Sequence, residues 1–255
     1  MEIKNVTIAG GGVLGAQIAY VTAFHGYNVT IWGRSEGSIE RVKPRVDKLY
    51  GIFTKELEVA PSYIGEENPN YPRSFFNDKS EITEERIEEL KQVNEDTYKG
   101  LKYTTDLEEA FGDADLVIEA IAEVVDEKKA FYEKIAPYLK EDAILVTNSS
   151  TLLPSTFREF TGREDKFLSL HFANSIWRQN LAEVMRHDTT SDEAFNAVIQ
   201  FAESIGMYAA VIKKEQPGYI LNSILVPLID AGLRLYGDDV AEPHDIDMDW
   251  KIGSG

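Results

Sequence analysis

Apolar and polar positions near the start of the chain follow the pattern of a strand, a tight turn, a helix and a second strand. The apolar run 6–9 stops at three glycines, and apolar residues then recur at helical spacing between positions 16 and 23. Gly26 can end that helix, because glycine readily adopts the left-handed conformation common at helix C-termini. Residues 28–32 are rich in β-branched side chains, which favour a strand. Together these segments predict the opening unit of a parallel α/β sheet.

The same alternation resumes after a polar interruption. Prolines and glycines punctuate residues 55–100, whose one helical pattern, 83–92, is strongly acidic, and we expect this stretch to form an arm that projects from the sheet. The remaining pattern predicts strands at 101–103, 115–120, 143–146, 167–170 and 208–212 and helices at 126–139 and 191–205. After Pro217 the pattern is helical through Tyr236.

The predicted fold is therefore α/β, with a Rossmann-type, doubly wound and mostly parallel sheet, an inserted helical arm and the start of an all-helical C-terminal domain. We expect residues 1–215 to form the nucleotide-binding domain, with the arm at about 55–100. Residues 216–255 are expected to begin a helical dimerisation domain that is incomplete in this chain. The predicted helix 218–236 carries a broad apolar surface, which needs a partner such as further helices or a second subunit.

Composition and charge narrow the class of protein. The 255 residues include 44 acidic and 26 basic side chains, a net charge of −18, which disfavours nucleic acid and anionic membranes as partners. Cysteine is absent, so disulfides, thiolate metal sites and cysteine nucleophiles are excluded, and no metal site is expected. No uncharged apolar run reaches the roughly 18 residues of a membrane span. These features predict a cytoplasmic globular enzyme.

A glycine-rich turn follows the first strand and opens the first helix. It has the form G-x-G-x-x-G, with Gly10 at the tight turn, Gly12 where the backbone approaches a pyrophosphate and Gly15 where helix and strand pack closely. The free N–H groups of the helix N-terminus, around Val13 and Leu14, favour the negative charge of phosphates. This context predicts a dinucleotide site rather than a glycine-rich turn without a ligand.

The end of the second strand departs from the usual pattern of such sites. A carboxylate there would bind the adenosine ribose, but this chain has Gly33, Arg34 and Ser35. An arginine can bind a 2′-phosphate through two hydrogen bonds, so the coenzyme is predicted to be NAD or NADP, with a preference for NADP. The alternative is a solvent-exposed Arg34 and a relaxed choice of coenzyme.

Only one of the four histidines lies where a sheet of this kind places its ligands. His171 follows a buried strand at its C-terminal end, and the hydroxyl-rich segment 147–151 follows the preceding strand. His25 and His244 lie at helix ends and His187 in a loop, so these three are expected to be structural. Spacing alone leaves two interpretations of His171 open, a general base or a histidine whose hydrogen bonds are satisfied within the fold.

Seven segments occur in the order seen in one known family. They are Gly10 to Gly15, Ile118-Glu119-Ala120-Ile121-Ala122-Glu123, Asn148-Ser149-Ser150, His171-Phe172-x-Asn174, Glu183-Val184, Pro217-Gly218-Tyr219-x-x-Asn222 and Asp245-Ile246-Asp247. In these segments the chain resembles the L-3-hydroxyacyl-CoA dehydrogenases, over nearly its whole length outside the arm. The His–Glu spacing and the Pro-Gly-aromatic motif are specific to that family and its close relatives.

The resemblance implies a role for several of these residues. His171 would be the base that takes the proton of a secondary alcohol, and Glu183 would orient its ring and stabilise the imidazolium. Ser150 and Asn222 would hydrogen-bond the reacting oxygen. The residues that match those near the nicotinamide and its ribose are Glu123, Lys128, Asn148 and Asn174. Taken singly, Glu183 could be an exposed acid, Asn222 a helix cap and Lys128 part of a solvated charged run, but the ordered motifs favour the catalytic role of the His–Glu pair.

The chain departs from the family pattern at three places. Residues 175–178 replace a proline-rich turn, so Trp177 and Arg178 would stand near a reshaped substrate pocket, where Arg178 could bind a free carboxylate or be a surface charge. The arm helps hold coenzyme A in the family, yet residues 55–99 carry 12 acidic and 6 basic side chains, a balance of −6 that suits a polyphosphate poorly. The helical domain of the family continues beyond the equivalent of Gly255 and supplies a dimer interface.

We therefore expect an NAD(P)-dependent dehydrogenase with an acyl-CoA substrate, which interconverts (S)-3-hydroxyacyl-CoA and 3-ketoacyl-CoA and forms a homodimer through its helical C-terminal region. Two alternatives stay open. A dehydrogenase of a free 3-hydroxy acid is indicated by the similarity of residues 152–155 to the carnitine and gulonate branches of the superfamily, and by Arg178. A dinucleotide-binding protein without turnover would have no physical need for both His171 and Glu183.

Overall fold

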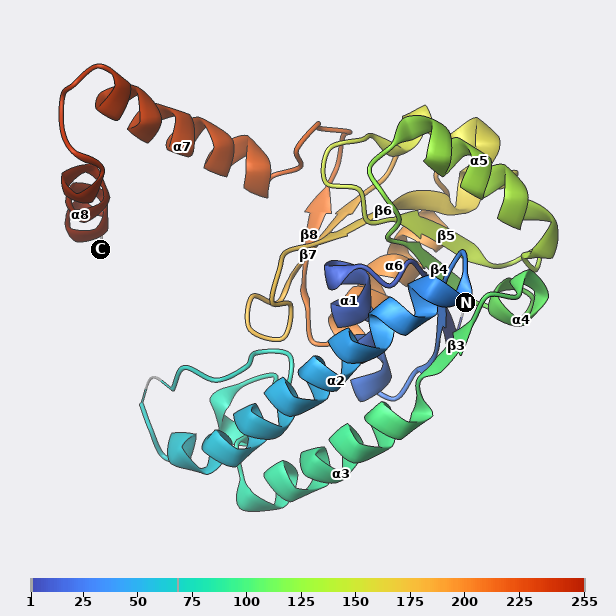
Figure 1. Cartoon of the computed structure of the whole chain (residues 1–255), viewed down its shortest axis with the longest axis horizontal. Coiled ribbons are helices and arrows are strands. Elements are labelled where there is room, and N and C mark those ends of the chain that lie inside the picture. Colours follow the sequence, from blue (N-terminus) through green and yellow to red (C-terminus); the bar gives the residue numbers. More distant parts are fainter. Residues whose placement is uncertain (1, 68, 255) are drawn as a thin grey trace.

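The computed structural model describes residues 2–67 and 69–254 and is built around one eight-stranded sheet (Figure 1). The strands are β1 (Asn5–Ala9), β2 (Asn28–Trp32), β3 (Lys102–Thr104), β4 (Leu116–Glu119), β5 (Ile144–Thr147), β6 (Phe167–Phe172), β7 (Leu181–Met185) and β8 (Tyr208–Ile212). Their order across the sheet is β3-β2-β1-β4-β5-β6-β7-β8, and every neighbouring pair is parallel except β6 and β7. The first six strands have the order of a doubly wound dinucleotide-binding sheet. The fold class predicted from the sequence is confirmed.

Alternate residues of the central strands enter two separate apolar cores, because neighbouring side chains of a strand point to opposite faces of the sheet. In β4, Leu116 and Ile118 pack in the core that contains residues of α1 (Val13–Phe24), α2 (Glu36–Val59), α3 (Glu84–Gly100) and α6 (Asp192–Ser204). Val117 packs in the other core, with residues of α4 (Leu107–Phe111) and α5 (Val125–Ile135). Burial on both faces explains why these strands are nearly continuous apolar runs.

The arm consists of the antiparallel helices α2 and α3 (Figure 1). The buried side chains of α2 recur every three or four residues, which is the spacing of one helical face: Ile39, Val42, Val46, Leu49, Phe53 and Leu57. The rings of Tyr50 and Tyr98 stack between the two helices, with their centroids 4.6 Å apart. The hydroxyl of Tyr20 in α1 donates a 2.7 Å hydrogen bond to Asn94, which joins the arm to the sheet domain. The sequence pattern did not predict α2, which ends at Val59 before the proline-rich loop, and α3 extends eight residues beyond the predicted helix.

Strand β7 has no counterpart among the predicted elements. Its sequence, Leu-Ala-Glu-Val-Met, contains a single β-branched residue and is therefore a weak strand signal. Its place comes from tertiary pairing, antiparallel to β6 and parallel to β8. That pairing sets Glu183 opposite His171.

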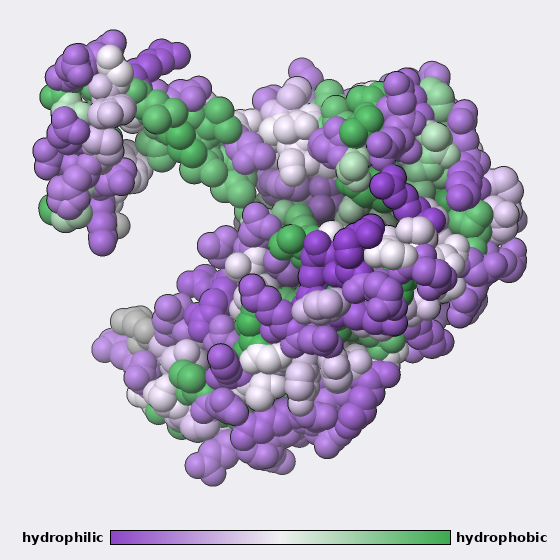
Figure 2. Space-filling model, in the orientation of Figure 1, coloured by the Kyte–Doolittle hydropathy of each residue, from purple (hydrophilic) through white to green (hydrophobic). Residues whose placement is uncertain are grey.

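After β8, helices α7 (Leu221–Gly237) and α8 (Pro243–Gly253) extend away from the sheet (Figure 1). Large apolar side chains are exposed along α7, where Figure 2 shows a hydrophobic surface: Ile224, Leu225, Val226, Leu228, Ile229, Leu233, Leu235 and Tyr236. Within the described residues, no helix is long and apolar enough to cross a membrane. The division into domains at residue 215 stays a prediction.

His25 makes the stability of this fold depend on pH. Its imidazole lies at the C-terminus of α1, and burial lowers the pKa of His25 to about 4. Below pH 6.5 the unfolded chain therefore binds a proton that the folded chain does not, and the folded state loses stability as the pH falls towards 4. Between pH 7 and pH 5, we expect the wild type to lose about 2 kcal/mol more of its free energy of unfolding than His25→Asn. Urea unfolding at both pH values measures this, and equal losses would contradict it.

Candidate active site

The glycine turn between β1 and α1 fits a bound dinucleotide. Gly10 has a φ of 116°, and a β-carbon there would lie 2.5 Å from the carbonyl oxygen of Ala120. A β-carbon on Gly15 would overlap the carbonyl oxygen of Gly10, so packing requires glycine at both positions. A β-carbon on Gly12, by contrast, would have no described atom within 4 Å. The open space at Gly12, before the N-terminus of α1, suits a pyrophosphate.

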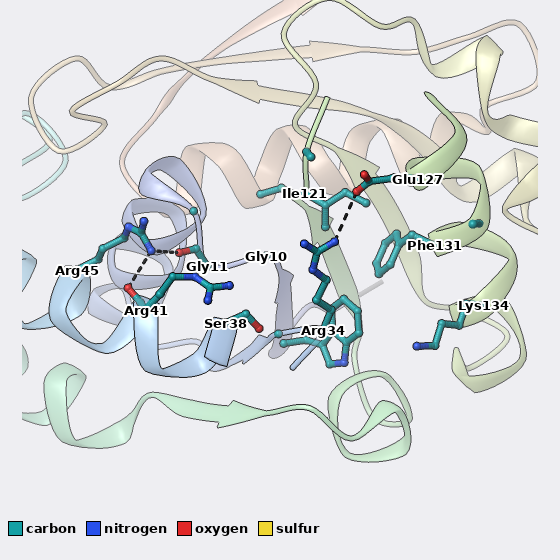
Figure 3. Close-up of a pocket in the computed structure, with 16 residues that line it drawn as sticks. Gly10, Gly11, Arg34, Ser38, Arg41, Arg45, Ile121, Glu127, Phe131 and Lys134 are labelled. Atoms are coloured by element: carbon teal, nitrogen blue, oxygen red, sulfur yellow. Dashed lines mark hydrogen bonds and ion pairs between the residues drawn. The ribbon is translucent and has the colours of Figure 1, made fainter. Parts of the chain in front are cut away.

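A cavity of about 590 Å³ begins at this turn and extends to the ends of β2 and α5 (Figure 3). Its charged lining residues are Arg34, Arg41, Arg45, Lys134 and Glu127. The charged side chains that line the cavity are thus mainly cationic, although the whole chain has a net charge of −18. Arg34 reaches towards Glu127, with 3.8 Å between the guanidinium and the carboxylate, and Arg45 donates a 3.1 Å hydrogen bond to the carbonyl oxygen of Gly11. The adenosine end of a dinucleotide would lie here.

The packing of neighbouring side chains favours glycine at position 33. A β-carbon at this position would overlap the hydroxyl of Ser38 and lie 2.8 Å from Ile39. Ser38 belongs to the capping box that Ser35 and Ser38 form at the N-terminus of α2. A carboxylate at position 33 would require the side chains of Ser38 and Ile39 to move.

A second cavity, of about 330 Å³, shares Gly12, Ala120 and Ile121 with the first. Eight of the predicted site residues line it: Gly12, Val13, Leu14, Gly15, Glu123, Lys128, Asn148 and Ser150. Asn148 also connects this cavity to the candidate base, because its side-chain oxygen accepts a 3.0 Å hydrogen bond from the backbone N–H of Phe172, next to His171. Asn148, which follows β5, thus joins the second cavity to the C-terminal end of β6.

Lys128 is buried, so its interpretation as a solvated surface charge is wrong. Its ammonium lies 2.5 Å from Oε1 of Glu119 and 3.3 Å from Oε2 of Glu123. Glu119, at the end of β4, is itself fully buried and accepts hydrogen bonds from the hydroxyls of Tyr132, at 2.6 Å, and Thr147, at 2.7 Å. These contacts hold the ammonium at the wall of the second cavity.

Glu123 organises the segment that carries Ser150. Its Oε1 accepts hydrogen bonds from the hydroxyl of Ser149 and, at 3.1 Å, from the backbone N–H of Ser150. Burial raises the pKa of Glu123, but the hydrogen bond from Ser149 and the charge of Lys128 outweigh it and leave the pKa below its usual value. At neutral pH this carboxylate is ionised and holds the loop in place.

His171 and Glu183 form a buried pair across β6 and β7. Nδ1 of His171 lies 2.9 Å from Oε2 of Glu183, and the two residues are 5% and 1% exposed. Oε1 of Glu183 accepts the backbone N–H groups of Ile220 and Leu221, both at 2.9 Å, where α7 begins. Burial raises the pKa of Glu183, but its hydrogen bonds with His171 and with these N–H groups outweigh it and lower the pKa. Glu183 is therefore a buried, ionised partner of the imidazole rather than an exposed acid.

This arrangement can hold a neutral imidazole in one tautomer. With its Nδ1–H directed at Glu183, His171 has Nε2 as its accepting nitrogen. Within the described residues, Nε2 makes no hydrogen bond to the protein. The pair has the chemistry of a general base oriented by a carboxylate.

Six predicted residues lie outside the lining of the two cavities: the pair His171 and Glu183, and Asn174, Asn222, Trp177 and Arg178. Asn174 is exposed in the turn after β6, and Asn222 is half-buried in the first turn of α7. Trp177 packs against an aromatic ring of α2. Arg178 forms a bidentate ion pair with Glu56 of α2, with distances of 2.7 Å and 2.5 Å. Trp177 and Arg178 thus fasten the turn between β6 and β7 to the arm.

Sequence reasoning missed five residues of the site region. Glu119, Tyr132 and Thr147 form the environment of Lys128, and Arg41 and Arg45 line the first cavity. A signal for Glu119 was present, because a carboxylate at the end of an apolar strand is costly to bury without partners. The signal for the arginines was their spacing of four residues, which places them on one face of a helix.

A comparison with known proteins matches residues 5–216 to a family model described as the NAD binding domain of 3-hydroxyacyl-CoA dehydrogenase. The chain is 30% identical to the 3-hydroxybutyryl-CoA dehydrogenase of Clostridioides difficile, over 98% of this chain and 78% of that protein. It is 29% identical to the mitochondrial hydroxyacyl-coenzyme A dehydrogenase of Rattus norvegicus, over 99% of this chain and 72% of that protein.

Solved structures give a similar result. A diketoreductase, described in the substrate-directed dual catalysis of dicarbonyl compounds, is 40% identical with a TM-score of 0.83, covering 100% of this chain and 80% of its own. The (S)-3-hydroxybutyryl-CoA dehydrogenase of Ralstonia eutropha is 26% identical with a TM-score of 0.80, covering 99% of this chain and 78% of its own.

Proposed function

The chain belongs to the 3-hydroxyacyl-CoA dehydrogenase family, whose members are NAD-dependent oxidoreductases, and on that ground we propose that it interconverts (S)-3-hydroxyacyl-CoA and 3-ketoacyl-CoA. The observation that carries the proposal is the buried pair of His171 and Glu183, whose side chains lie 2.9 Å apart, in the same sheet as a dinucleotide turn with all three glycines in place. A bound nicotinamide would accept or supply the hydride.

In the direction of oxidation, Nε2 of His171 takes the proton of the substrate hydroxyl, because Glu183 already binds Nδ1. The ionised Glu183 then stabilises the imidazolium. Ser150, at the second cavity, and Asn222, in the first turn of α7, donate hydrogen bonds to the reacting oxygen. The residues that would hold the nicotinamide and its ribose are Glu123, Lys128, Asn148 and Asn174, of which the first three line the second cavity.

A second candidate function is the reduction of a dicarbonyl compound that lacks coenzyme A. The 40% identity to a diketoreductase favours it, and so does the balance of −6 over residues 55–99, which suits a small substrate better than a polyphosphate. A carboxylate clamp at Arg178 has less support, because its Nε and Nη2 already donate to Glu56 and its Nη1 donates to the carbonyl oxygen of Asn70.

The oxidation of NADH with three 1,3-dicarbonyl substrates tests the proposal. Acetoacetyl-CoA, acetoacetate and 2,4-pentanedione share a reactive ketone and differ in the group beside it. We expect the highest kcat/KM for the thioester. Turnover of the diketone alone would move the assignment to the second function, and turnover of the free acid alone to a hydroxy-acid dehydrogenase. No turnover of any substrate by a chain that binds NADH would favour a dinucleotide-binding protein without catalysis.

The comparisons name NAD and give no support to the expected preference for NADP. That preference stays a proposal, in which Arg34 and Arg41 bind the 2′-phosphate. Both line the first cavity, near the N-terminus of α2, whose partial positive charge favours a phosphate. We expect Arg34→Ala and Arg41→Ala each to raise the KM for NADPH about tenfold and to leave the KM for NADH within about twofold. Lys48→Ala, on the exposed side of α2, is the matched control. A wild-type preference for NADH, or equal changes in both KM values, would contradict the proposal.

A homodimer through the helical C-terminal region is likewise proposed. Its support is the apolar surface of α7, where Ile224 is 65% and Leu233 is 61% exposed. Contiguous apolar surface of this kind is typical of an interface. Two copies could cover it by presenting the same face to each other, and light scattering in solution would give the mass of two chains.

A further inference from the structure

We infer that Tyr219 is a positioning residue for the catalytic pair, with its ring fixing the plane of the His171 imidazole. The inference rests on the proposed function, in which His171 is the base. Tyr219 lies in the Pro-Gly-Tyr turn between β8 and α7, and its side chain is 1% exposed. Its ring stacks on the imidazole, with centroids 4.6 Å apart and 27° between the planes.

The stacked ring supplies a constraint that Glu183 cannot supply. A single hydrogen bond at Nδ1 holds one edge of the imidazole and leaves the ring free to pivot about that bond. A second ring against the face of the imidazole blocks the pivot and so fixes the direction of Nε2. Hydride and proton transfer both require reacting atoms within a few tenths of an ångström of their productive positions, so the plane of this ring matters for the rate.

The backbone of the same turn serves the other member of the pair. Tyr219 has a φ of 56°, in the left-handed region that a residue with a side chain adopts at a cost. This conformation points the aromatic ring inwards, and the next two residues then direct their N–H groups at Oε1 of Glu183. One turn thus sets the plane of the imidazole and the position of the carboxylate that binds it.

The part of Tyr219 that acts is the ring and not the hydroxyl. The ring packs with Met185 and Ile212 in a small apolar cluster, which restricts its movement. The hydroxyl is buried near that of Ser169, and neither makes a hydrogen bond of good geometry among the described residues. Such a contact contributes little stability, so phenylalanine should replace tyrosine with little loss.

Three variants test the inference. Tyr219→Phe keeps the ring, Tyr219→Leu removes it, and Phe201→Leu makes the same kind of aromatic deletion in α6, where Phe201 is 2% exposed. Tyr219→Met replaces the leucine variant if that variant does not fold. The readouts are kcat, KM and the ¹H–¹⁵N resonances of the His171 ring, which are assigned by their loss in His171→Gln.

We expect Tyr219→Leu to lower kcat about 10- to 100-fold with KM values within about threefold, and to shift or broaden the His171 ring resonances. Tyr219→Phe should match the wild type, and Phe201→Leu should lower only the thermal midpoint. A wild-type kcat in Tyr219→Leu, unchanged His171 resonances, or an equal loss in Tyr219→Phe would each overturn the inference. Absence of turnover in the wild type would refute the proposed function instead, and the resonances would still decide the role of Tyr219.

Discussion

His171→Gln is expected to lower kcat by about 10²- to 10⁴-fold, the contribution typical of a positioned general base. Glutamine is close in size to histidine but cannot take up a proton at neutral pH. His171 lines neither of the two cavities at the glycine turn, so the dissociation constant for NADH, measured by fluorescence, should stay within about twofold. His187→Gln is the matched control, because His187 is also buried, at 2% exposed, and lies two residues beyond the C-terminal end of β7. A His171→Gln enzyme with wild-type turnover would refute the mechanism.

Glu183→Gln should produce a loss of similar size for a different reason. Its amide oxygen can still accept the N–H groups of Ile220 and Leu221, so its amide NH₂ would face Nδ1 of His171. Nδ1 would then become the acceptor, and the proton would move to Nε2, which is the wrong tautomer for a base. Equal activity of Glu183→Gln and the wild type would show that the carboxylate does not select the tautomer.

Glu119→Leu is expected to lower the free energy of unfolding by about 3 to 5 kcal/mol, because it leaves the ammonium of Lys128 buried without its nearest counter-charge. Glu123, at 3.3 Å and partly exposed, is too distant to replace a 2.5 Å contact fully. Urea unfolding monitored by tryptophan fluorescence measures the change. Glu40→Gln, in the exposed pair with Lys43, should leave stability unchanged and serves as the control.

A double-mutant cycle separates the ion pair from the packing around it. In Glu119→Leu with Lys128→Met, both charges are gone and apolar side chains of similar length fill the space, so the loss should be smaller than the sum of the two single losses. Strictly additive losses would mean that the two groups do not interact. The double variant should nevertheless bind NADH more weakly if Lys128 contacts the coenzyme.

The elements that the sequence predicted well are those that local pattern determines. Strand β4 is a run of apolar residues buried on both faces, and the turn at Gly10 has backbone requirements that glycine alone meets. Strand β7 was not predicted, because its pairing with β6 and β8 stabilises it and the β-propensity of its own residues is weak. Helix α2 was not predicted, because it buries only one face and is polar over the rest of its surface.

The candidate site divides in the same way. His171 was identifiable because the C-terminal ends of parallel strands are where such sheets bind ligands. The burial of Lys128 could not be predicted from the sequence. A lysine in a charged run gives no indication that its ammonium will contact Glu119, nine positions earlier in the chain. Arg178 shows the same limit, since its partner Glu56 lies 122 residues away in the chain. Contacts between distant segments decide whether a charged residue is free to act or already paired.

Helix α7 joins two features that have been treated separately. Its first turn donates two N–H groups to Glu183, and its outer surface is the exposed apolar face. A helix transmits tilt and rotation along its length, so whatever covers that face also sets the position of the carboxylate. If a second copy of the chain covers that face, as proposed above, activity per molecule should depend on the concentration of the enzyme. Dilution that separates the chains would lower the specific rate before any unfolding could be detected, and the rate would return when the same sample is concentrated.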